Sequence, residues 1–156
     1  MKKRVIIVSV CLLIFSCATQ EVCEEGLKAE VIVTLKTSVN EVMLDTIVSG
    51  VDVYGIRTGK ADSLLYDSAK VAKLLLPLDP NNDSSAFVIG VDSISDTITF
   101  YHSSTVYMIS YTCGFANDFT LTGITFTANN LKDIELINDD VFSEDSDTEE
   151  HCRFYF

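Results

Sequence analysis

The chain has 156 residues, of which 23 are aspartate or glutamate and 11 are lysine or arginine, so its formal net charge is −12. A surface this acidic repels the phosphates of nucleic acids, which excludes nucleic acid from the expected partners. The length suits one domain with a hydrophobic core.

Residues 1–16 have the pattern of a secretion leader. Lys2–Arg4 form a basic start, and Val5–Phe15 is an apolar run, shorter than the roughly 20 residues that a membrane-spanning helix needs. The run ends on Ser16 and Cys17, a small residue directly before a cysteine, which resembles the bacterial lipobox. The pattern predicts a lipoprotein, with removal of the leader and a diacylglycerol attached to the cysteine thiol. The alternative is an ordinary signal peptide that is cut elsewhere.

A lipid on Cys17 predicts a membrane anchor. Several acyl chains on one cysteine hold a protein stably, since each buried CH₂ contributes about 0.8 kcal/mol. Ala18 follows, rather than the aspartate that often retains lipoproteins in the inner membrane, so we expect a cell-envelope lipoprotein at the outer membrane. Acidic residues begin only at Glu21, which leaves open whether the protein faces the periplasm or the cell surface. Without residues 1–16, which hold three basic residues and no acidic one, the net charge is −15.

Residues 17–26 read as a polar tether, and residues 27–156 read as one β domain. Residues 28–36 alternate between apolar and polar side chains, as in a strand with one buried face. Similar patterns predict strands at 46–56, 63–66, 73–78, 96–101, 106–111, 119–126, 131–137 and 152–156. The run 86–91 is apolar on both faces, which predicts a central strand. Short strands between turn residues, with no substantial helix, predict an all-β fold: a single antiparallel β-sandwich, immunoglobulin-like or transthyretin-like. The acidic residues within 138–150 predict an exposed loop.

An ordered set of short motifs resembles a known family. The set consists of Val53-Tyr54-Gly55, Asp62–Tyr66, Leu76–Pro80, Asp83 with Phe87, Cys113-Gly114-Phe115, and His151 with Tyr155-Phe156. In this order the motifs are similar to an uncharacterised family of small lipoproteins from Bacteroidota, a domain of unknown function, over nearly the whole chain after the leader. The resemblance implies an envelope location in a Gram-negative bacterium, and it implies no activity.

Three cysteines beyond the anchor can form a disulfide, namely Cys23, Cys113 and Cys152. The envelope is oxidising, which favours one pair and leaves one thiol over. The resemblance includes a cysteine near the N-terminus and the Cys-Gly-Phe motif, which favours a Cys23–Cys113 disulfide that closes a loop of about 90 residues. Cys23–Cys152 is the alternative, since connectivity does not follow from sequence.

A metal site could combine His102 and His151 with Cys113 and Cys152, but their spacing matches no compact ligand motif. We therefore expect surface histidines and a structural disulfide, with no metal and no cofactor.

Asp79-x-Asn81-x-Asp83 resembles the start of a calcium-binding loop. Ser84 stands where that loop needs glycine, and Gly90 stands where it needs an acidic ligand. The segment therefore predicts a turn between two strands. A weak calcium site there, or in residues 139–150, is the alternative.

No catalytic residue is assigned. The sequence has no Gly-x-Ser-x-Gly or Ser-x-x-Lys motif, and it offers only two histidines as bases. Cys113 with His102 would make a thiol dyad, but an oxidised Cys113 cannot attack a substrate. We expect a non-enzymatic module that binds or scaffolds an envelope protein or glycan. The alternatives are an envelope hydrolase with a carboxylate pair in a loop cleft, and a small outer-membrane β-barrel.

Overall fold

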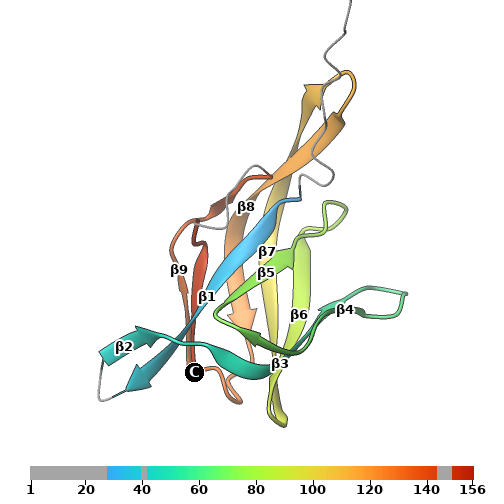
Figure 1. Cartoon of the computed structure of the whole chain (residues 1–156). Coiled ribbons are helices and arrows are strands. Elements are labelled where there is room, and N and C mark those ends of the chain that lie inside the picture. The colour runs from blue at the N-terminus through green and yellow to red at the C-terminus, as the bar shows by residue number, and fades with distance from the viewer. Residues whose placement is uncertain (1–27, 40–41, 144–148) are drawn as a thin grey trace, which may run out of the picture.

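The computed structural model describes residues 28–39, 42–143 and 149–156. These residues form two β-sheets that pack face to face, and no helix occurs among them (Figure 1). The predicted all-β sandwich is therefore confirmed. In these ranges no helix has the length and apolar character needed to cross a membrane.

The first sheet is built around β1. Its strands are β1 (Glu30–Val39), β2 (Val42–Asp45), β5 (Lys73–Pro77), β9 (Asp133–Leu136) and β11 (Cys152–Tyr155). The first half of β1 pairs antiparallel with β5, and its second half pairs antiparallel with β2. On the opposite edge β1 pairs in parallel with β11, with Val33 opposite Cys152 and Lys36 opposite Tyr155. β9 then pairs antiparallel with β11 and completes the order β2-β1-β11-β9.

The second sheet is antiparallel throughout. Its order is β10-β8-β7-β6-β3-β4, from the strands β3 (Val48–Ile56), β4 (Ser63–Val71), β6 (Ser84–Val91), β7 (Ile94–Ser110), β8 (Gly114–Phe126) and β10 (Asp140–Val141).

The core lies between the inward faces of the two sheets. Alternate residues of β1 and β11 from the first sheet meet alternate residues of β3, β6 and β7 from the second. Phe87 and Phe100 pack edge to face, with ring centroids 6.1 Å apart. The fully buried side chains include Val31, Val33, Leu35, Val51, Val53, Leu74, Leu76, Ile98, Phe100 and Phe154. The apolar residues at every second position of these strands therefore face inward and form one apolar layer between the sheets.

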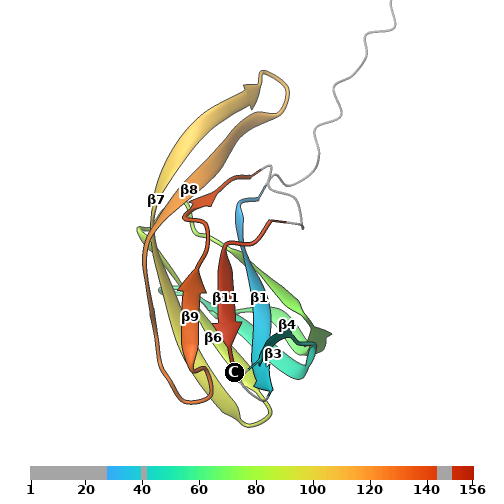
Figure 2. The same cartoon turned by 90° about the vertical axis from the view of Figure 1, so that its left-hand side faces the viewer.

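β7 is longer than the sequence predicts. The two strands expected at 96–101 and 106–111 are one strand, because its hydrogen-bonded ladder with β8 continues past a register shift at Tyr101 and His102. The outer part of this hairpin, residues 103–117, is called the arm below. The arm projects beyond the ends of the other strands (Figures 1 and 2).

The acidic segment at residues 138–150, predicted to be an exposed loop, contains a short strand. Asp140 and Val141 pair with β8, and the Val141 side chain is fully buried, so this part is a short strand rather than a loop. Residues 144–148 lie outside the described residues, as do Cys17, where lipidation is predicted, the predicted tether and Cys23.

Candidate functional site

A hollow of about 540 Å³ lies between the β3–β4 hairpin and the β5–β6 turn. Arg57 and Lys60 line it from the hairpin, and Asn82 lines it from the turn. Phe87 contributes an apolar wall, and Asp79 is the single carboxylate of the lining. The hollow therefore suits a ligand with both polar and apolar groups, and it lacks the pair of carboxylates that a glycosidase uses.

Asp79 holds the β5–β6 turn together. Its carboxylate accepts a hydrogen bond from the backbone N–H of Asn81 at 2.9 Å and one from the side-chain amide of Asn82 at 2.8 Å. These hydrogen bonds, the backbone one foremost, hold the pKa of Asp79 below its ordinary value. The turn predicted for Asp79-x-Asn81-x-Asp83 is confirmed, and the asparagines engage both carboxylate oxygens of Asp79.

Ser85 and His102 connect this turn to β7. Ser85 Oγ accepts the backbone N–H of Asp79 at 2.8 Å and shares a hydrogen bond of 2.9 Å with Nε2 of His102. The backbone N–H of His102 donates to the carbonyl of Asp83 at 2.9 Å. The imidazole also packs edge-on against Phe119, with centroids 5.0 Å apart. Burial lowers the pKa of His102, although the carboxylates of Asp79 and Asp83 act in the opposite direction.

A hydroxyl–imidazole pair of this kind acts as nucleophile and base when a third group orients the imidazole. Nδ1 of His102 is buried, and no partner for it lies within the described chain. Ser85 is itself buried at the edge of the hollow. Through the hydrogen bonds of Ser85 Oγ to Asp79 and to His102, the pair bridges the turn and β7. No sequence motif indicates the Ser85–His102 pair, although the alternation of β7 places His102 on the same face as Ile98 and Phe100.

The expectation of surface histidines is wrong for both residues. His151, directly before β11, is fully buried. Its Nδ1 accepts the backbone N–H of Ile32 at 2.9 Å, and its own backbone N–H donates to the carbonyl of Ile32, also at 2.9 Å. The imidazole thereby satisfies a main-chain donor just before the first pair of the β1–β11 ladder, Val33 with Cys152. Among the described residues no group of three or more histidine, cysteine and acidic side chains could hold a metal ion.

Asp96 is a buried carboxylate that the sequence analysis did not single out. It accepts hydrogen bonds from the hydroxyl of Thr127 at 3.0 Å and from the backbone N–H groups of Asn129, Asn130 and Leu131 at 2.7, 2.9 and 2.8 Å. Burial acts to raise its pKa, but the hydrogen bonds outweigh burial, and the pKa lies below its ordinary value. Asp96 thus fixes the loop between β8 and β9.

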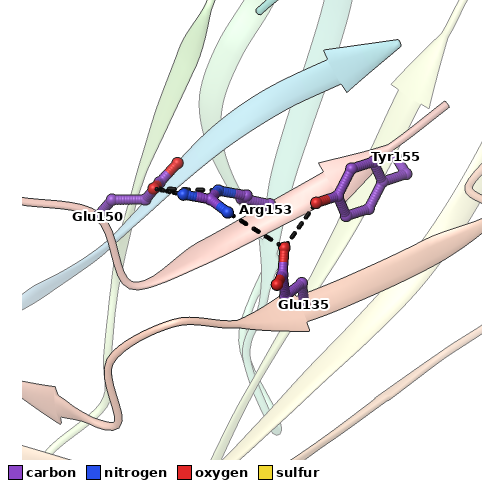
Figure 3. Close-up of polar contacts among 4 residues, drawn as sticks. All are labelled: Glu135, Glu150, Arg153 and Tyr155. Atoms are coloured by element: carbon purple, nitrogen blue, oxygen red, sulfur yellow. Dashed lines mark hydrogen bonds and ion pairs between the residues drawn. The ribbon is translucent and has the colours of Figure 1, made fainter. Parts of the chain in front are cut away.

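The outer face of the first sheet carries a charged network (Figure 3). Register places Arg153 opposite Glu135, and the Arg153 guanidinium contacts Glu135 at 3.3 Å and Glu150 at 2.7 Å. The Tyr155 hydroxyl donates to Glu135 at 2.6 Å. This hydrogen bond raises the pKa of Tyr155 and lowers that of Glu135. The hydrogen bonds from Arg153 likewise lower the pKa of Glu150, so both glutamates are ionised at neutral pH and neither suits a general acid.

Cys152 and Cys113 differ in state. Cys152 is a free, fully buried thiol in β11, and burial raises its pKa to about 12. Cys113, in the turn at the tip of the arm, is not a free thiol, and Cys152 is not its partner. The alternative Cys23–Cys152 disulfide is therefore not formed. The Cys23–Cys113 disulfide and the lipid on Cys17 involve residues outside the described ranges and stay predictions.

A model of a family of unknown function, DUF6452, matches residues 50–156, which run from within β3 to the end of the chain. The chain belongs to this family. No curated protein and no solved structure matches. The DUF6452 region contains Asp96, His102 and the network around Arg153, whereas β1 and β2 precede it. The resemblance to a family of unknown function is thus confirmed, and the family supplies no activity.

Proposed function

We propose that this DUF6452 protein is a lipoprotein of the Gram-negative cell envelope, anchored by lipid on Cys17, whose β-sandwich binds another envelope component. The observation that carries the proposal is the order of a basic start, an apolar run and Ser16-Cys17 ahead of the sandwich. Every described strand lies at or after Glu30. The resemblance to lipoproteins of Bacteroidota and the alanine after Cys17 support an outer-membrane location.

Three observations favour binding over catalysis. The hollow beside the β5–β6 turn has one carboxylate. Hydrogen bonds hold the pKa values of Asp79, Asp96, Glu135 and Glu150 below their ordinary values, so none of these four carboxyl groups is held protonated near neutral pH. Within the described residues, no group bonds Nδ1 of His102 to orient the imidazole as a base. Arg57 and Lys60 at the hollow supply positive charge on an otherwise acidic protein, which suits a glycan or protein partner with acidic groups.

The anchor is tested by mass spectrometry of the protein isolated from envelope membranes. The wild-type chain should begin at Cys17 and carry the mass of acyl chains. Cys17→Ser should lose that mass and accumulate with its leader. Cys11→Ser is the matched control, because Cys11 lies inside the apolar run and should not change the product. A wild-type chain without acyl mass, or one that begins at another residue, would refute the anchor.

Binding at the hollow is tested by pull-down with the acylated protein. Retention of an envelope component should fall for the double variant Arg57→Glu with Lys60→Glu. The matched control is Lys70→Glu with Lys132→Glu, which reverses two exposed charges outside the lining of the hollow. Equal retention by both double variants would rule out this hollow as the binding site. Membrane fractionation then decides whether the protein lies in the outer or the inner membrane. Protease treatment of intact cells decides whether it faces the periplasm or the cell surface.

A further inference from the structure

The arm exposes apolar side chains on one of its faces. Met108 lies directly opposite Phe115 in the β7–β8 ladder, so the two side chains share a face. Val106, two residues before Met108, lies on the same face. Val106 is 62% exposed and Phe115 is 70% exposed, and Tyr111 at the turn is 98% exposed. On the same face of β7, deeper in the molecule, lies the buried core residue Phe100. The core face of the sheet therefore continues uncovered along the arm.

The opposite face of the arm is covered in part. The Tyr107 hydroxyl hydrogen-bonds Ser143 Oγ at 2.7 Å, and the backbone N–H of Ser143 donates to the Asp118 carboxylate at 2.9 Å. Ala116, directly opposite Tyr107, is buried. These contacts hold the arm in place from one side and leave the face with Phe115 as the exposed one.

The arm is also uncharged. No aspartate, glutamate, lysine or arginine lies between Asp96 and Asp118, in a chain in which 22% of the residues are charged. Surfaces that contact only water normally carry charged side chains, so this uncharged stretch is unexpected for such a surface. A neutral tip rich in tyrosine and apolar side chains is instead the composition found at the interface of a lipid bilayer.

The arm lies at the end of the sandwich where the described chain begins. Lys28 and Phe115 line one hollow of about 340 Å³ at the base of the arm. Ten residues lie between Cys17 and Lys28, and the eleven Cα-to-Cα steps span at most about 40 Å when fully extended. A lipid on Cys17 would therefore hold this end of the sandwich close to the membrane. This step rests on the proposed anchor.

We propose that the arm is a membrane-contacting element that inserts its tip, with Tyr111, Phe115, Met108 and Val106, into the headgroup region of a phospholipid bilayer. The preferred surface is zwitterionic, because the acidic remainder of the protein is repelled by anionic lipids. The arm and the lipid then fix the domain at two points, which sets its orientation on the membrane as well as its location.

The experiment uses the absence of tryptophan from the chain. Tyr111→Trp introduces a sole tryptophan at the tip. Ser93→Trp is the matched control, because Ser93 is exposed in the β6–β7 turn at the opposite end of β7. Both chains begin at residue 17, which retains every described strand, and carry a histidine tag in place of Cys17 that binds nickel-chelating lipid in phosphatidylcholine vesicles. Tethering by the tag makes the result independent of natural acylation, so failure of the arm and failure of the anchor are distinguishable.

On vesicles the Tyr111→Trp chain should show a blue-shifted emission, and brominated phosphatidylcholine should quench it roughly twofold or more beyond the Ser93→Trp chain. Adding Phe115→Asp and Met108→Glu should abolish the shift, with the circular dichroism spectrum unchanged. Equal emission for both tethered chains would overturn the proposal. A blue shift without vesicles that grows with protein concentration would also overturn it, because it would assign the face to a second copy of the chain.

Discussion

Asp96 lies beneath the β8–β9 loop and accepts three backbone N–H groups and one hydroxyl. Asp96→Ala removes the acceptor and leaves buried donors without partners, so the free energy of unfolding should fall by about 3 kcal/mol. Urea unfolding measures this change. Asp67→Ala is the control, since Asp67 is exposed on β4, and it should change the free energy by less than about 0.5 kcal/mol. Equal losses in the two variants would contradict the assigned role.

The same carboxylate sets a pH dependence. The pKa of Asp96 is lower in the folded protein than its ordinary value of 3.8, so the unfolded chain binds its proton first as the pH falls. The contribution of Asp96 to stability is therefore complete well above pH 3.8 and is lost progressively below it. The free energy of unfolding should decline less steeply below that pH in Asp96→Asn than in the wild type, as followed by urea unfolding at a series of pH values.

His102 gives a second pH dependence, in a different range. Burial holds its pKa in the folded protein below the ordinary value of 6.5, so the unfolded chain takes up a proton before the folded one does. Stability from this residue is complete above pH 6.5 and falls below it, by at most about 1.4 kcal/mol per pH unit. NMR titration of the imidazole should give a pKa below 6.5. A pKa at or above 6.5 would show that burial does not dominate over the carboxylates of Asp79 and Asp83.

For single residues, the sequence predicts contacts between near neighbours in the chain but not contacts between residues far apart in the chain. The Asp79 turn follows from Asp-x-Asn chemistry, because its partners lie two and three residues away. Asp96 bonds to residues more than 30 positions away, and Ser85 bonds to a histidine 17 positions away. The alternation of β7 does place Asp96 and His102 on the core face, and a polar side chain on that face was the available signal. The partners themselves depend on the pairing of strands.

Among the strands, β11 has an unusually central place for the last element of the chain. It lies between β1 and β9, and its Phe154 is fully buried. Phe154→Ala should lower the free energy of unfolding by about 3–5 kcal/mol, because it removes apolar contacts and leaves a cavity. Phe142→Ala is the matched control, since Phe142 is 46% exposed, and it should cost less than about 1 kcal/mol. A small loss for Phe154→Ala would mean that β11 is peripheral to the core.

Strand positions follow from the sequence wherever one face is buried. The alternation at 28–36 overlaps β1, which begins at Glu30, and the apolar run at 86–91 lies within β6. β10 was missed because two residues within an acidic segment carry no periodic signal, although Val141 is buried there. The exposed Ser103–Thr105 read as a break between strands, but backbone pairing with β8 does not need apolar side chains, and the strand continues through them.

For the whole molecule, the class of fold could be predicted and the order of the strands could not. Period-two patterns and turn residues suffice for a sandwich. The parallel pairing of β1 with β11 joins residues 119 positions apart, and nothing local specifies it. Its specificity comes from packing, since Val33, Cys152 and Phe154 are all fully buried once the strands pair. The polar network of Arg153 and Glu135 on the outer face follows from the antiparallel register of β11 with β9.

The reactivity of the cysteines reports on the packing and the cross-linking of the whole molecule. Cys152 is buried and its pKa is raised to about 12, so it should resist iodoacetamide in the folded protein and react only after unfolding. Under the proposed Cys23–Cys113 pairing, Cys113 should react only after reduction, and non-reducing peptide mapping should recover the two peptides joined. Reduction should also lower the free energy of unfolding by up to about 4–5 kcal/mol, since the disulfide closes a loop of about 90 residues in the unfolded chain. Labelling of Cys113 without reduction would contradict the predicted disulfide. Labelling of Cys152 in the folded protein would mean that β11 opens from its place between β1 and β9.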